Sequence, residues 1–204
     1  MLVFMDSTMS LRERKKLATK QALAFTAMTL AVERGLENVR VQDITDAVNV
    51  SRRTFTNYFS NKEEAIASLN ADRFTRAVAA LRERPADEPL ASALAEVFAA
   101  QYEAATGMDP QRIELVRMMM SSPALQGEAL NTMTQAEGPL AKAIAQRTGA
   151  DPGGDLYTQV LAAAVMAAVR AATGHWTATG GAGSLPGLIR QAIGQVAAAP
   201  APAA

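Results

Sequence analysis

The chain has 204 residues, 49% of them hydrophobic and 20% charged, and its twenty Lys and Arg balance twenty Asp and Glu. This length suits one two-part domain or two small domains with a real hydrophobic core. The absence of cysteine excludes disulfides and thiolate metal sites, one histidine cannot form a histidine cluster, and no uncharged apolar run has the length of a membrane span.

Charge is distributed unevenly along the chain. Residues 1–62 hold ten Lys and Arg against six Asp and Glu, and the remainder holds ten against fourteen. A net +4 is therefore followed by a net −4, which indicates a polyanionic partner for the N-terminal part. The apolar start of the chain has no basic segment before it, unlike a secretory signal, so we expect a cytoplasmic protein.

The first predicted helix runs from Ser10 to Arg34, after a flexible N-terminus of residues 1–9. Ala, Leu, Met, Glu, Gln and Arg dominate the chain, and strand-like runs are missing, so the composition predicts an all-α fold. Ser10 and Glu13 have the spacing of a capping box, and Gly35 suits the end of the helix.

Two short helices and a tight turn follow. We expect helices over 41–48 and 52–58, separated by Asn49, which tolerates a left-handed conformation, and by Ser51, which can cap the next helix. Phe55 and Phe59 form the inner face of the 52–58 helix. The segment "SNKE" (60–63) is a second capping box that opens a helix to about Arg84. This arrangement is a helix-turn-helix.

The outer face of the 52–58 helix carries groups that suit duplex DNA. Arginine forks bind guanine, Asn pairs with adenine, and Ser and Thr hydroxyls serve bases or phosphates. Tyr58 and Lys62 are placed to hold phosphate, and Lys15, Lys16 and Lys20 add attraction that does not depend on sequence. For any single residue a solvated polar face is the better interpretation. The turn, the caps and the charge asymmetry together favour DNA binding.

Residues 27–66, "AMTLAVERGLENVRVQDITDAVNVSRRTFTNYFSNKEEAI", resemble the signature of the tetracycline-repressor (TetR) family of bacterial transcription regulators without a gap. The resemblance implies an all-α homodimer of about nine helices, with a three-helix DNA-binding domain and a variable ligand-binding body. It places on the recognition helix Arg52, Arg53, Thr54, Asn57 and Tyr58, and it gives Ser51 and Lys62 to backbone phosphates. The predicted DNA-binding residues are Lys15, Arg40, Ser51, Arg52, Arg53, Thr54, Thr56, Asn57, Tyr58 and Lys62.

Four positions depart from the family pattern. Ala31 replaces a common aromatic in the first helix, and Arg40 stands where Thr often opens the second helix, which removes a cap but adds a cation. Asn49 replaces the turn glycine. Arg52 stands where relatives usually have Pro or a small residue, so we expect a different operator sequence.

The remaining helices are predicted over 90–106, 110–122, 124–148, 154–178 and 185–198. The segment "RPADEP" (84–89) precedes them, and Pro139 predicts a kink or break near Gly138. The predicted domains are 10–62 for DNA binding and 63–198 for ligand binding and dimerisation, with a disordered tail of residues 199–204.

An apolar, methionine-rich lining is the candidate ligand site. The stretches "LVRMMMSSPAL" and "TGADPGGDLYTQVLAAAVMAAVRAATGHWTATGG" resemble a TetR subfamily that binds acyl-CoA-like ligands. Methionine adapts to varied ligands, although ordinary core filling is the favoured interpretation for each Met taken alone, and three consecutive Met cannot share one helix face. The candidate residues are Phe98, Tyr102, Arg117, Met118, Met119, Met120, Met133, Met166 and Arg170.

Arg117 and Arg170 each interrupt an apolar helix. Either could meet a ligand carboxylate or phosphate, but snorkelling, or pairing with Glu103 or Glu114, is the favoured interpretation. His175 and Trp176 suit packing or a dimer edge.

The last two predicted helices carry apolar and small residues that suit close helix packing. The family resemblance implies that they form a two-fold dimer interface, and closing the monomer's own core is the alternative. The residues are Leu156, Val160, Ala164, Ala168, Leu188, Ile189, Ala192, Ile193 and Val196.

These observations together predict a ligand-responsive repressor. It is expected to bind a palindromic operator as a homodimer and to be released by a small apolar or acyl-type effector, without cofactor or metal. One His, no Cys and no paired carboxylates leave little equipment for an enzyme. The alternatives are a helical protein-interaction module and an acyl-group enzyme, neither of which binds DNA.

Overall fold

The computed structural model describes residues 10–103, 117–118, 121–151 and 155–197, and these are helical with no β-strand among them. The all-α prediction is confirmed. The chain divides into two compact units, Met1–Leu69 and Asn70–Ala204. The predicted flexible N-terminus and tail lie outside the described residues.

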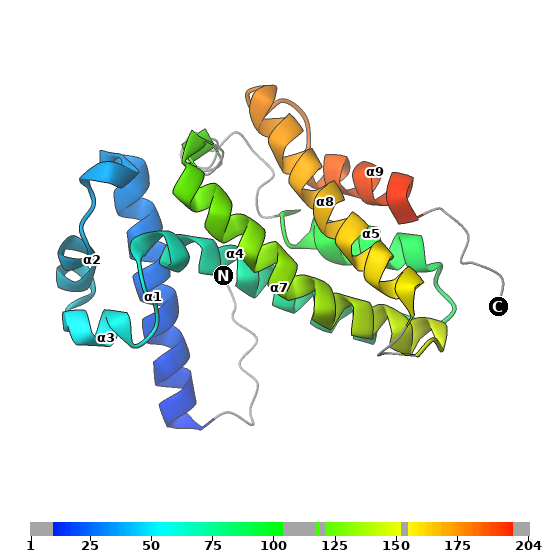
Figure 1. Cartoon of the computed structure of the whole chain (residues 1–204), viewed down its shortest axis with the longest axis horizontal. Coiled ribbons are helices and arrows are strands. Elements are labelled where there is room, and N and C mark those ends of the chain that lie inside the picture. Colours follow the sequence, from blue (N-terminus) through cyan, green and yellow to red (C-terminus); the bar gives the residue numbers. More distant parts are fainter. Residues whose placement is uncertain (1–9, 104–116, 119–120, 152–154, 198–204) are drawn as a thin grey trace. The chain divides into compact units, whose positions relative to one another are not determined.

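The first unit is a helix-turn-helix closed by two longer helices. It contains α1 (Leu11–Arg34), the 3-10 turn η1 (Leu36–Asn38), α2 (Val41–Val48), α3 (Arg52–Thr56) and the start of α4 (Lys62–Glu83). α2 packs against α1 and α3, as Figure 1 shows at the blue and cyan end of the chain. The core of this unit is made by Leu23, Ala27, Leu30, Ile44, Phe55, Phe59 and Ile66.

Local capping signals decide where the first three helices begin and end. Ser10 and Glu13 form the predicted capping box, and Gly35 ends α1 at φ 83°. Asn49 adopts the left-handed conformation at φ 56° and ψ 50°, and the Ser51 hydroxyl accepts a hydrogen bond from the Thr54 amide at 3.0 Å. These predictions are confirmed.

Two expected boundaries in this unit are wrong. α3 ends at Thr56 rather than at residue 58. α4 is capped one residue later than predicted, because the Glu64 amide donates to the Asn61 side chain at 2.6 Å. The Glu64 carboxylate accepts a hydrogen bond from the Ser60 amide at 2.7 Å. The capping residue is therefore Asn61 instead of Ser60, and Ser60 contributes its backbone amide instead of its hydroxyl.

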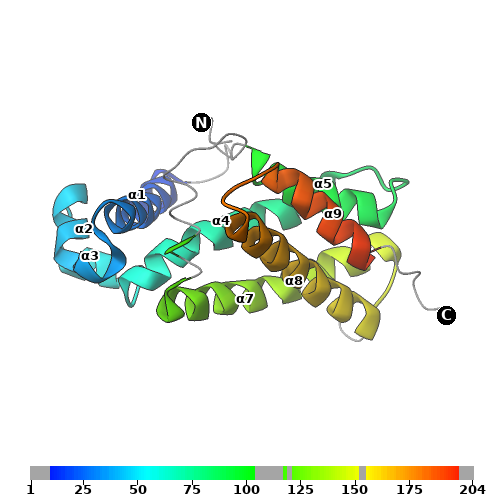
Figure 2. The same cartoon turned by 90° about the horizontal axis from the view of Figure 1, so that it is seen from above.

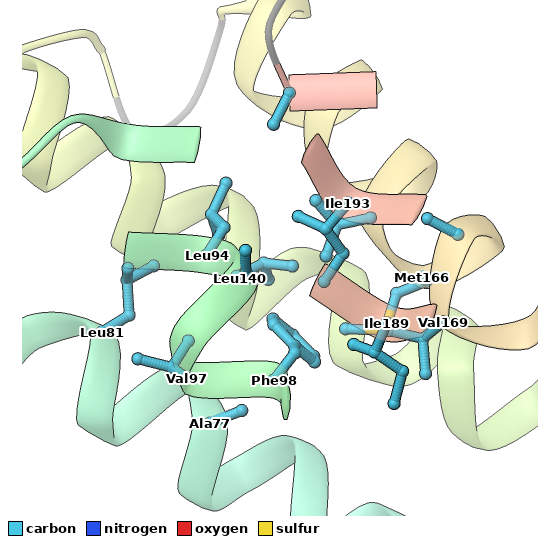
Figure 3. Packing of buried hydrophobic residues seen from close by; sticks show 14 of the residues in the cluster. Ala77, Leu81, Leu94, Val97, Phe98, Leu140, Met166, Val169, Ile189 and Ile193 are labelled. Atoms are coloured by element: carbon cyan, nitrogen blue, oxygen red, sulfur yellow. The ribbon is translucent and has the colours of Figure 1, made fainter. Parts of the chain in front are cut away.

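The second unit is built from the rest of α4, α5 (Leu90–Ala100), α7 (Pro123–Thr148), α8 (Leu156–Ala178) and α9 (Leu185–Ala197). α8 packs against α7 and α9, and α9 packs against α5; both views show α8 beside α9 (Figures 1 and 2). One continuous apolar cluster fills the space between them, with Leu94, Phe98 and Leu140 facing Met166, Ile189 and Ile193 in Figure 3.

Arg147 fastens the connection between α4 and α5 to the end of α7. Its guanidinium donates to the carbonyls of Arg84 at 3.2 Å, Pro85 at 2.5 Å and Glu88 at 2.7 Å. Its side chain is 9% exposed, so it is a nearly buried cation surrounded by carbonyl acceptors.

Two predictions about the helices of the second unit differ from the structure, and a third lies mostly outside the described residues. The helix that opens at residue 90 ends at Ala100 rather than near 106. Most of the predicted 110–122 helix lies outside the described residues. α7 runs unbroken through Pro139, so the predicted break near Gly138 is wrong, and a kink there stays a prediction. Pro139 and Gln135 are both exposed, so the carbonyl that loses its helical donor can be hydrated.

Candidate nucleic-acid interface

Two buried aromatic rings hold α3 and leave its other face exposed. Phe55 and Phe59 are 0% and 2% exposed, and their ring centroids lie 5.7 Å apart. A side chain on the opposite face of so short a helix cannot reach the core. The exposed residues on α3 and its flanks are Ser51, Arg52, Arg53, Thr56 and Asn57, while Thr54 and Tyr58 are half-buried.

Most of the exposed donors of α3 have no acceptor among the described residues. Arg52, Arg53 and Asn57 make no hydrogen bond or ion pair with their side chains to any other described residue. The Thr56 hydroxyl donates to the Arg53 carbonyl at 3.1 Å, so its free capacity is as an acceptor. The α3 face therefore offers guanidinium forks and one amide to an external partner.

The turn before α3 is fixed by backbone hydrogen bonds. The Val50 amide donates to the Thr45 carbonyl at 3.0 Å, and the Asn49 amide donates to the Asp46 carbonyl at 3.1 Å. Thr45 is fully buried, and its hydroxyl donates to the Gln42 carbonyl at 3.0 Å. This turn sets α3 across α2 in the layout that places a recognition helix in a major groove.

The predicted phosphate-binding cations fall into two groups. Lys15 on α1 and Arg40, the residue before α2, are exposed. Lys62 is half-buried, and its ammonium donates to the carbonyls of Leu36 at 2.5 Å and Val39 at 2.7 Å. Lys62 is thus occupied by the protein's own backbone, which its place beside the recognition helix in sequence did not reveal.

The candidate ligand residues are spread over different environments. Phe98 and Met166 are fully buried in the core cluster, and Phe98 lies near Phe74 with ring centroids 6.4 Å apart. Tyr102 is buried, Met118 and Met133 are half-buried, and Arg117 and Arg170 are exposed. Arg170 therefore needs no internal partner. Met119 and Met120 lie outside the described residues.

Two arginines that the sequence did not single out organise this region. Arg73 lies 5.2 Å from the centre of the Tyr102 ring, and it donates to the Asn70 side chain at 2.7 Å. Burial raises the pKa of Tyr102, and the nearby Arg73 charge lowers this pKa in part. The i, i+3 spacing of Asn70 and Arg73 was the one available signal, because Tyr102 is distant in sequence.

Arg190 is the second of these two arginines, and it joins α9 to α5. It binds Glu96 through two hydrogen bonds of 2.9 and 3.1 Å and Glu103 at 2.8 Å. These hydrogen bonds raise the pKa of Arg190. Glu103, considered as a partner for Arg117 or Arg170, thus pairs with Arg190.

The apolar residues of α8 and α9 divide between two faces. Ala168, Ile189 and Ile193 are buried in the protein's own core, as the monomer-closing alternative requires. Leu156 and Val160 are 71% and 57% exposed, and Val196 is also exposed. By length and mean hydropathy (1.3) α8 would suit a membrane span, with 44% of its apolar window buried; the core cluster accounts for that buried part.

The sequence matches known proteins along most of its length. Residues 26–69 match the family model of bacterial regulatory proteins of the tetR family, and residues 84–200 match that of the MftR C-terminal domain. The HTH-type transcriptional regulator TcmR of Streptomyces glaucescens is 30% identical over 172 residues, which cover 81% of this chain and 76% of TcmR.

Solved structures with the same fold include two bacterial regulators. A TetR-family transcriptional regulator of Syntrophomonas wolfei superposes with a TM-score of 0.60 at 16% identity, covering 88% of this chain and 93% of that one. The fatty acid degradation regulator FadR of Bacillus halodurans gives 0.56 at 15% identity, covering 88% and 94%. With its helix-turn-helix and its matches to both halves of the family, this chain belongs to the TetR family of DNA-binding transcriptional regulators.

Proposed function

We propose that this regulator is a repressor that binds a palindromic operator as a homodimer and is released by a small apolar or acyl-type effector. The observation that carries the proposal is the exposed, internally unused face of α3, held in place by Phe55 and Phe59. A cytoplasmic location follows from a DNA partner.

Base reading is assigned to α3 and phosphate binding to the residues around it. Arg52 and Arg53 can each fork onto guanine O6 and N7, and Asn57 can pair with adenine. Arginine in both positions predicts half-sites that contain G·C pairs. Thr54 and Thr56 offer hydroxyls at the edge of this face. The phosphate contacts are assigned to Lys15, Arg40, Ser51 and Tyr58.

The operator is tested with DNA that flanks the protein's own gene. The wild-type protein is expected to retard a fragment of this DNA in a gel shift and to protect an inverted repeat from cleavage. Asn57→Ala is expected to relax base preference at one position per half-site, at a cost of about 1–3 kcal/mol. Arg82→Ala removes an exposed arginine of α4 outside the recognition helix and serves as the control.

Two outcomes would contradict this docking. One is a wild-type protein that binds all duplexes equally or none, which would favour a protein-interaction module. The other is an Asn57→Ala variant whose base preferences equal those of the wild type and of the Arg82→Ala control.

The effector is assigned to the apolar side chains of the second unit. Phe98, Tyr102 and Met166 are buried and Met133 is half-buried against them, so a ligand would have to displace or rearrange packed side chains. Methionine does this at low cost because its side chain is unbranched and flexible. Arg117 and Arg170, which are exposed, and Met118, which is half-buried, are assigned to the solvent side of this site, and Met120 is assigned to it from the sequence alone.

A series of acyl-CoA thioesters with increasing chain length tests the effector class. A true effector is expected to raise the thermal unfolding midpoint and to release the operator fragment in the same concentration range, because one ligand shifts one equilibrium. Free coenzyme A is the control for the nucleotide part. If no acyl-CoA of the series changes the unfolding midpoint or releases the operator fragment, acyl-CoA thioesters are excluded as effectors.

The homodimer interface is assigned to the exposed face of α8 and α9. Leu156, Val160 and Val196 lie on these helices and are not covered by the protein's own core. Exposed large apolar side chains on adjacent helices are typical of a surface that another subunit covers. Two copies joined in this way would present two recognition helices to successive major grooves.

A further inference from the structure

We infer that Lys62 is a positioning residue that clamps both ends of the helix-turn-helix together, and that its effect on DNA binding does not come from a phosphate contact. The inference rests on the proposed operator binding. It differs from the assignment that its position in the sequence suggested.

The Lys62 ammonium is bound to the protein on two sides. It donates to the Leu36 carbonyl at 2.5 Å and to the Val39 carbonyl at 2.7 Å. An ammonium has three N–H donors, so one remains for water or another acceptor. Charge-assisted hydrogen bonds of this length are among the stronger ones in proteins, so a contact with DNA phosphate would have to replace two of them.

The two carbonyls lie at the entrance of the helix-turn-helix, and Lys62 lies at its exit. Residues 40–61, which hold α2, the turn and α3, form the segment between them. Lys62 therefore closes a loop whose contents are the DNA-reading elements. Closing a loop of this length limits the freedom of everything inside it.

Both anchor points are themselves fixed. Leu36 and Val39 have buried side chains, and the Asn38 side chain donates to the Arg34 carbonyl at 2.7 Å, which ties η1 to the end of α1. Because both acceptor carbonyls belong to a fixed segment, their hydrogen bonds to Lys62 also fix the position of the start of α4.

Electrostatics also favours the clamp over a free cation. Lys62 is the first residue of α4, where the helix dipole disfavours positive charge. Two carbonyl oxygens offset that penalty, and Glu63 and Glu64 in the same turn add negative charge. The neighbouring Glu64 amide is capped by Asn61, so this helix end is already occupied by the protein's own groups.

The test compares neutral variants that differ only in hydrogen-bond donors. Lys62→Met keeps the length of the stem and removes all donors, whereas Lys62→Gln is equally neutral but keeps two donors. Operator affinity, measured on the full-length protein with the fragment that the wild type binds, is expected to fall about tenfold or more in Lys62→Met and to recover in part in Lys62→Gln. Binding to an unrelated duplex of equal length should change less.

The salt dependence separates a clamp from a phosphate contact. The slope of log affinity against log salt is expected to stay at the wild-type value in both variants, because no counterion is released at this position. Loss of a phosphate contact would reduce the slope by about 0.9. Lys142→Met removes an exposed lysine of α7 and controls for the change in net charge.

Several results would overturn the proposed role of Lys62. A slope reduced in both variants, or equal affinities of Lys62→Gln and Lys62→Met, would overturn it in favour of phosphate binding. A lower unfolding midpoint with unchanged operator affinity would reduce Lys62 to a structural residue. If Lys62→Met does not fold, Lys62→Gln alone tests the inference. A salt slope equal to that of the wild type, with a weaker preference for the operator over the unrelated duplex, supports the clamp, and a reduced slope overturns it. A wild type that binds no DNA overturns the proposed function itself.

Discussion

Asn49 holds the turn of the helix-turn-helix in a conformation that few residues accept. Its φ of 56° and ψ of 50° lie in the left-handed region, which costs most residues with a β-carbon about 1–2 kcal/mol. Asn and Asp tolerate this region, and glycine, which has no β-carbon, adopts it freely. The direction of α3, and hence of Arg52 and Arg53, depends on this conformation together with the backbone hydrogen bonds of the turn.

Two substitutions at Asn49 are expected to differ in their effect on the stability of the first unit. Asn49→Ala should destabilise the first unit by about 1 kcal/mol, because alanine has the β-carbon without the local hydrogen bonding that tolerates this region. Asn49→Gly should be neutral within a few tenths of a kcal/mol, since glycine adopts the conformation freely. Urea unfolding measures both, and equal destabilisation by Ala and Gly would show that the side chain, not the backbone, is what matters.

Residues that act on near neighbours were predictable, and those that act across the chain were not. Ser10, Asn49 and Ser51 work within three or four positions, where spacing alone identifies a cap. Lys62 binds carbonyls 23 and 26 positions away, and Arg190 binds Glu103 across 87 positions. No periodicity in the sequence encodes such pairs, because they depend on how helices pack.

The cap of α4 is a local feature that spacing alone leaves undecided. Ser60 with Glu63 and Asn61 with Glu64 both satisfy the spacing of a capping box, so local pattern cannot choose between them. The structure selects Asn61. The α3 face was predictable because Phe55 and Phe59 mark its buried side unambiguously, whereas the depth of Phe98 and Met166 depends on helices far along the chain.

At the scale of elements, the segment that joins α4 to α5 is held from outside by α7. Arg147 supplies hydrogen bonds to three carbonyls of this segment, and Arg84 binds Glu88 through its Nε at 2.6 Å and through a second nitrogen. A surface turn thereby becomes a rigid joint between three helices.

Removing the Arg147 fork is expected to loosen that joint. Arg147→Met should lower the free energy of unfolding of the full-length protein by about 2 kcal/mol, because carbonyls lose donors that carried charge. Arg147→Lys should recover only part of this, since an ammonium cannot imitate the planar fork. In denaturant unfolding, the expected order of the free energy of unfolding is wild type, then Arg147→Lys, then Arg147→Met. An Arg147→Lys variant as stable as the wild type would mean that the positive charge alone suffices.

The Arg84–Glu88 pair gives this joint a pH dependence. The hydrogen bond from Arg84 lowers the pKa of Glu88. A carboxyl with a lowered pKa in the folded state adds stability that is fully present above its ordinary pKa, about 4.3, and is lost as pH falls through the folded pKa. The loss therefore falls in the acidic range below about pH 4.3, and neutral pH leaves the pair intact.

Glu88→Gln is expected to remove that component. Between pH 5 and pH 3 the unfolding midpoint of Glu88→Gln should fall less steeply than that of the wild type. Asp87→Asn removes an exposed carboxylate from the same segment without touching Arg84, so it is the matched control. Parallel curves for the two variants would show that the Arg84–Glu88 pair contributes nothing to acid sensitivity.

At the scale of the whole molecule, one chain supplies one recognition helix. A single α3 of five helical residues reaches few base pairs, so the affinity of one copy is expected to be low. The exposed apolar residues of α8 and α9 are the surface that could join a second copy. Operator binding and self-association should therefore be lost together.

Val160→Asp tests that link. A charge at this position, where the side chain is 57% exposed in the single chain, should leave the fold intact but oppose burial against a second copy. The expected result is a monomer in sedimentation, with an unfolding midpoint that no longer rises with protein concentration and lies below that of the wild-type dimer, and with operator affinity reduced at least tenfold because each head binds alone.

The control is Gln146→Glu, which adds one negative charge at an exposed position of α7 and should leave the mass in solution and the operator affinity unchanged. A Val160→Asp protein that remains dimeric would place the interface elsewhere on the second unit. A monomer that still binds the operator as tightly as the wild type would contradict the need for two recognition helices, since the gain in affinity from joining two heads would then be absent.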